Sequence, residues 1–104
     1  MSNWPFQDDP STIVITTAEI TSQERPILYA SHELDEDNDV VWQFYYNEKA
    51  FDFAQAVLVR LDTAYRIDPT LEGVAQLPIG YFAKRTHVGA EWEAIPLASA
   101  DKDD

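Results

Sequence analysis

The stretch Val40-Val41-Trp42-Gln43-Phe44-Tyr45-Tyr46 decides the fold prediction. Its β-branched and aromatic residues are typical of a β-strand. Successive side chains on a strand point to opposite faces, so Trp42, Phe44 and Tyr46 share one face and Val41, Gln43 and Tyr45 share the other. We expect Trp42 and Phe44 to pack into the core. The other face should leave at least one aromatic ring partly exposed.

An acidic turn precedes this strand. Glu33-Leu34-Asp35-Glu36-Asp37-Asn38-Asp39 holds five carboxylates in seven residues. The stretch Ile27-Leu28-Tyr29-Ala30-Ser31-His32 before it reads as another strand. Three further strands are predicted where β-branched or aromatic runs lie between turn residues, at 12–17, 81–85 and 91–95.

Between these strands the hydrophobic period changes. From Asp52 to Arg66 the apolar residues recur at helical spacing, and Asp52 with Gln55 fits a capping box. A second, short helix is predicted over 68–73, with Asp68 as its cap and Pro69 in its first turn.

The order of these elements predicts an α+β domain with a mostly antiparallel five-stranded sheet, one main helix and one short helix. We expect a single domain over 12–97, a flexible N-terminal arm over 1–11 and an acidic C-terminal tail over 98–104. Trp4 and Phe6 are the residues of the arm that would pack against the domain.

The net charge of the chain limits the classes of partner that we expect. The chain has 104 residues, 19 acidic and 7 basic, and a formal net charge of -12. Such a field repels phosphate backbones and anionic membrane surfaces, so we expect neither nucleic-acid nor membrane binding. It speeds encounter with a basic protein. The sequence shows neither a secretory signal nor an apolar run long enough to span a bilayer, so we expect a cytoplasmic protein.

Catalytic and metal-binding patterns are weak. The chain has no cysteine and three glycines, which removes thiolate chemistry and a glycine-rich phosphate loop. Asp35, Asp37 and Asp39 match the first ligand positions of an EF-hand loop, but Val40 and Tyr46 stand where glycine and glutamate are required. We therefore assign no catalytic, cofactor-binding or metal-binding residue and expect no enzyme. Distant carboxylates that meet in the fold, as in a hydrolase, remain open as an alternative.

The remaining class is binding. Large rings anchor interfaces and flanking acids orient a basic partner, although an acidic loop is more often simply solvated. The candidate partner-binding residues are Tyr29, Glu33, Asp35, Glu36, Asp37, Asp39, Trp42 and Tyr45.

One family shows similar segments in the same order. Asp39-Val40-Val41-Trp42-Gln43-Phe44 resembles the Asp-small-x-Trp-x-Phe segment of the immunity protein 33-like family. The order then continues with the helix around Leu61, Ile67-Asp68-Pro69-Thr70-Leu71, Leu77-Pro78-Ile79-Gly80, Arg85 and Trp92. The resemblance covers roughly 12–97, and Val40 departs from it where the family favours a small residue.

This resemblance implies a small bacterial cytoplasmic protein, placed in some members beside a toxin that it neutralises. It carries over no catalytic residue. The function expected is therefore non-enzymatic immunity through binding of a cognate toxin, for example a basic nuclease. The alternative is a protein-interaction or regulatory module that forms a homodimer.

Overall fold

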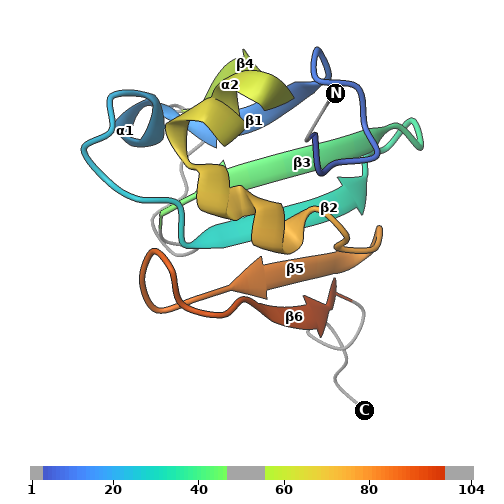
Figure 1. Cartoon of the computed structure of the whole chain (residues 1–104). Coiled ribbons are helices and arrows are strands. Elements are labelled where there is room, and N and C mark those ends of the chain that lie inside the picture. The colour runs from blue at the N-terminus through green and yellow to red at the C-terminus, as the bar shows by residue number, and fades with distance from the viewer. Residues whose placement is uncertain (1–3, 47–55, 98–104) are drawn as a thin grey trace.

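The structure is a computed structural model that describes residues 4–46 and 56–97. Within these residues a single sheet of six strands has the order β4-β1-β3-β2-β5-β6 (Figure 1). Its strands are β1 (Ile13–Thr17), β2 (Tyr29–Leu34), β3 (Val40–Tyr45), β4 (Ala56–Arg60), β5 (Tyr81–Lys84) and β6 (Glu93–Pro96). The helices are α1 (Ala18–Thr21), α2 (Leu61–Ile67) and the 3-10 helix η3 (Pro69–Val74). The α+β class is therefore confirmed.

The sheet is mixed. β2 and β3 form an antiparallel hairpin, and β5 and β6 extend the sheet beyond β2 with antiparallel pairing. On the other side β1 lies parallel to β3 and antiparallel to β4. The prediction of five mostly antiparallel strands is thus only roughly right, because it lacks β4 and the parallel pair.

The predicted helix over 52–66 is wrong in its middle part. Ala56–Arg60 is strand β4, and helix α2 begins only at Leu61. Five residues of β4 pair with five of β1, and alternation places Val57 and Val59 on the core side. Valine fits a pleated surface well, so pairing with β1 overrides the helical spacing. The proposed capping box at 52–55 lies outside the described residues.

All the described helices lie on one face of the sheet (Figure 1). The core fills the space between them and includes Val14, Trp42, Phe44, Leu61 and Leu71. Trp42 is only 1% exposed and Phe44 is fully buried, so the predicted core face of β3 is confirmed. We call the opposite sheet face, which carries Tyr29, Val41 and Tyr45, the open face, because no described helix lies on it.

The N-terminal segment belongs to the packed body. Phe6 is buried in the core. Its ring meets Trp42 edge to face at 5.4 Å, and Trp4 meets Tyr65 edge to face at 5.6 Å. The expected packing of Trp4 and Phe6 is therefore confirmed, and the expected flexible arm over 1–11 is corrected for its described part, residues 4–11, which packs on the core through these two rings.

The short helix over 68–73 appears as η3. The Asp68 side chain accepts a hydrogen bond from the Thr70 N–H at 3.0 Å and Pro69 occupies the first turn, as predicted. Within residues 4–46 and 56–97, no helix combines the length and the apolar character that a membrane crossing requires.

Candidate partner-binding surface

The acidic turn between β2 and β3 is held by its own aspartate. The Asp35 Oδ1 accepts hydrogen bonds from the N–H groups of Asp37 at 2.8 Å and Asp39 at 2.9 Å. The Asp35 N–H donates to the Asp39 carbonyl at 2.9 Å. Asn38 has a φ of +66°, a left-handed conformation that asparagine tolerates well. The sequence Asp-Glu-Asp-Asn-Asp therefore closes the hairpin and turns its carboxylates outward.

Every residue from 34 to 40 is exposed. Ligand oxygens of Asp35, Asp37 and Asp39 lie within 4.8 Å of one another. The side-chain bonds of Asp35 to two backbone N–H groups account for this proximity. The turn is thus a concentrated region of negative charge.

An exposed apolar pair lies at the base of the turn. Leu34 pairs with Val40 across the hairpin, and they are 49% and 39% exposed. Both lie on the helix side of the sheet, as Trp42 does, but beyond the core. Sequence reasoning missed them, although alternation along β3 gives Val40 the same side as Trp42. We call Leu34, Asp35, Glu36, Asp37, Asp39 and Val40 the hairpin surface.

The aromatic candidates do not join the hairpin surface. Trp42 is sealed in the core, so its assignment as a partner-binding residue is wrong. Tyr29 and Tyr45 stack as a cross-strand pair with centroids 5.7 Å apart and an interplanar angle of 4°. Both rings are half-buried on the open face. Tyr29 lies four residues from Glu33 along β2, a separation of about 13 Å. Glu33 lies on the open face too, opposite Val41.

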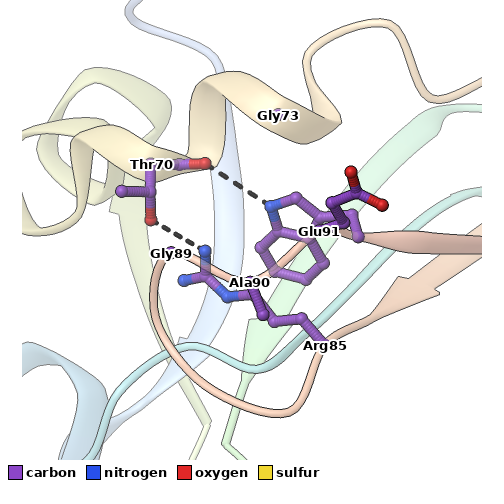
Figure 2. A pocket seen from close by; sticks show the side chains of 7 residues that line it. Thr70, Gly73, Arg85, Gly89, Ala90 and Glu91 are labelled. Carbon is purple, nitrogen blue, oxygen red and sulfur yellow. Dashed lines mark hydrogen bonds between the residues drawn. The ribbon is translucent and has the colours of Figure 1, made fainter.

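A second polar cluster surrounds Arg85, at the end of β5. The Arg85 side chain is 1% exposed, and its Nη2 lies 2.7 Å from Oδ2 of Asp68, which is 10% exposed. Nε and Nη2 both donate to the Ile27 carbonyl, at 3.1 and 2.9 Å. Nη1 donates to Thr70 Oγ1 at 2.8 Å, as Figure 2 shows.

Trp92 covers this cluster. The Arg85 guanidinium carbon lies 4.2 Å from the Trp92 ring centroid, a cation–π distance. The indole N–H donates to the Thr70 carbonyl at 3.4 Å (Figure 2). Asp68, Thr70, Arg85 and Trp92 are residues that carried the family resemblance, and the fold brings them together. The bonds of Arg85 to Asp68, Thr70 and Ile27 tie the start of η3 to the segments directly after β5 and before β2.

Paired carboxylates, the alternative for acid–base chemistry, occur in two cavities of the described structure. Glu24 and Asp68 line one of about 460 Å³, and Glu91 and Glu93 line another of about 570 Å³ beside Lys84. Asp68 is already bonded to Arg85 and to the N–H of Thr70. Both oxygens of Asp68 are therefore already engaged within the cluster around Arg85.

Comparison with protein-family models, with curated proteins and with solved structures gave no match to this chain.

Proposed function

We propose that this chain is a non-enzymatic, immunity-type protein that binds and neutralises a basic toxin protein through the hairpin surface. The observation that carries the proposal is the combination of exposed carboxylates on a self-closed turn with an exposed apolar pair at its base. The resemblance to immunity protein 33-like segments supports the biological role, and the exposure and charge of the turn support the choice of docking surface.

The negative charge of the hairpin surface would raise the rate at which a basic partner associates. The carboxylates of Asp35, Glu36, Asp37 and Asp39 project from one exposed turn of a chain whose net charge is -12. Complementary potentials steer diffusional encounter and raise association rates, and salt screens this effect. A basic partner would therefore approach the hairpin end of the molecule first.

The apolar pair would slow dissociation of the bound partner. Interface energy comes mainly from a few desolvated anchors inside a polar rim. Leu34 and Val40 lie beside the acidic turn, so a partner that pairs with the carboxylates covers them as well. This arrangement favours a protein partner over a small cation.

The test is neutralisation of a toxin encoded beside this chain in its source genome. The variant Glu36→Lys/Asp37→Lys changes net charge without removing the Asp35 carboxylate that holds the turn. The control Glu24→Lys/Glu72→Lys makes the same change at two exposed positions outside the hairpin. We expect the hairpin variant to lose neutralisation and to associate at least about tenfold more slowly at low salt, with a smaller effect at high salt. Equal behaviour of the two variants would refute the proposal.

A second candidate function, homodimerisation, has one observation in its favour. Leu58 on β4 is 67% exposed and Ile13 on the neighbouring β1 is 55% exposed. β4 lies at one edge of the described sheet, where a second strand can pair. Light scattering over a wide concentration range, with Leu58→Lys as the matched variant, distinguishes a dimer from a monomer.

A further inference from the structure

A cavity opens beside the base of the hairpin. It has a volume of about 250 Å³ and is lined by Gln7, Asp8, His32 and the loop 75–79. The Gly80 N–H donates to the His32 carbonyl at 2.7 Å, which holds this loop against β2. Figure 1 shows the N-terminal segment, the β2–β3 turn and the start of β5 at the same end of the sheet.

The His32 ring is held in one orientation at the wall of this cavity. Its Nδ1 lies 2.7 Å from the Leu77 carbonyl oxygen. An oxygen of this kind only accepts, so Nδ1 carries the proton and Nε2 of the neutral ring has a lone pair. Nε2 is buried and has no hydrogen-bond partner among the described residues. The ring cannot turn over freely, because it stacks on Trp42 at 3.8 Å with an interplanar angle of 10°.

Asp8 is held in place by two tryptophans. Its main-chain carbonyl accepts from the Trp4 indole N–H at 2.7 Å, and its Oδ1 accepts from the Trp42 indole N–H at 3.2 Å. A carboxylate has about four lone-pair positions, so it can accept further donors. The cavity therefore contains a preorganised negative charge.

The rest of the lining fits an aliphatic chain. Leu77, Pro78 and Ile79 supply an apolar wall, and none of the lining residues is lysine or arginine. The volume is below the roughly 300–1,000 Å³ of typical small-molecule sites. This size favours a single side chain over a cofactor.

We propose that this cavity receives one cationic side chain, a lysine or arginine, from the basic partner. The ammonium or guanidinium group pairs with Asp8, and the aliphatic stem lies against Leu77 and Pro78. His32 lies two residues from Leu34 on the same side of β2, about 7 Å along the strand. The cavity thus lies close to the hairpin surface on the same side of the sheet, and the inference rests on the proposed function for the source of the side chain.

The test uses n-butylammonium chloride as the probe and amide and indole NMR shifts as the readout. The Trp42 indole N–H reports on the site because it bonds to Asp8, and the Trp92 indole serves as an internal control. The matched probe is 1-butanol at the same concentration and ionic strength. Asp8→Asn removes the charge and keeps an oxygen for Trp42, while Asp9→Asn makes the same change at a neighbouring carboxylate outside the cavity.

We expect a saturable shift of the Trp42 indole with n-butylammonium and none with 1-butanol. Asp8→Asn should raise the half-saturation concentration at least about tenfold, and Asp9→Asn should change it less than twofold. No shift, an equal shift with 1-butanol, or equal effects of the two variants would overturn the proposal. Loss of neutralisation by Glu36→Lys/Asp37→Lys without a Trp42 shift would leave the proposed function standing and remove only the cavity.

Discussion

Removal of the Asp68 carboxylate is the most informative perturbation of this fold. In Asp68→Ala the buried Arg85 guanidinium loses its counter-charge, and a buried pair broken from one side typically costs about 3–5 kcal/mol. The same change removes the N-cap of η3, whose side chain accepts from the Thr70 N–H. Loss of such a cap costs about 1 kcal/mol, which is included in the roughly 3–5 kcal/mol. The control is Asp62→Ala, which breaks the Arg60–Asp62 pair, whose side chains are 56% and 25% exposed. An exposed pair is worth about 0–1 kcal/mol.

Urea unfolding followed by tryptophan fluorescence measures both costs. We expect the midpoint of Asp68→Ala to fall several times further than that of Asp62→Ala. The free energy of unfolding of a domain is about 5–15 kcal/mol, so Asp68→Ala can leave too little stability for the fold to form. Asp68→Asn, which keeps a side-chain oxygen, serves as a milder second variant. Equal losses for Asp68→Ala and Asp62→Ala would show that the Arg85 charge is not buried, and the description of the cluster would be wrong.

Three further predictions address other parts of the chain. In Gly73→Ala a Cβ would meet the Trp92 ring at 2.6 Å, so we expect a loss of about 1–3 kcal/mol in urea unfolding and a changed Trp92 environment. Phe6→Ala should cost about 3–5 kcal/mol in the same assay; a loss below about 1 kcal/mol would contradict the packing of the N-terminal segment. Hydrogen bonds from the Ser11 N–H and hydroxyl lower the pKa of Asp9 below its ordinary 3.8, so Ser11→Ala should raise that pKa in an NMR titration. Because the folded-state pKa is lowered, the contribution of Asp9 to stability is present above pH 3.8 and is lost as the pH falls through the lowered value.

The parts of the fold that local pattern determines were predictable. The alternation of Trp42 and Phe44 identified the core face of β3, and the Asp68-Pro69 step identified the start of η3. β4 was not predictable in this way, because its valines and leucine fit a helical and an extended spacing equally well and only pairing with β1 decides. The burial of Phe6 agrees with the expectation that Trp4 and Phe6 would pack against the domain, and only the flexibility expected for the rest of the described arm was wrong.

The candidate site was predictable only in part. The turn residues Asp35 and Asn38 signal an exposed acidic hairpin, and the structure has one. The expectation that rings adjoin the acids failed because the hairpin is longer than a side chain reaches, which separates Tyr29 and Tyr45 from the turn. The apolar residues that lie next to the acids are instead Leu34 and Val40. Their exposure depends on where the helices end over the sheet, which local sequence pattern does not give.

The position of β1 has a consequence for synthesis of the chain. Among the strands of the described sheet β1 comes first in the sequence, yet both of its neighbours, β3 and β4, come later. At about 5–20 residues per second, the 43 residues from Thr17 to Arg60 take about 2–9 s. β3 is complete at Tyr45 and β4 only at Arg60, so throughout that interval this β-branched segment lacks at least one of its sheet neighbours. An unpaired strand edge is a place where other chains can associate. Slower translation should therefore lower the yield of the native protein.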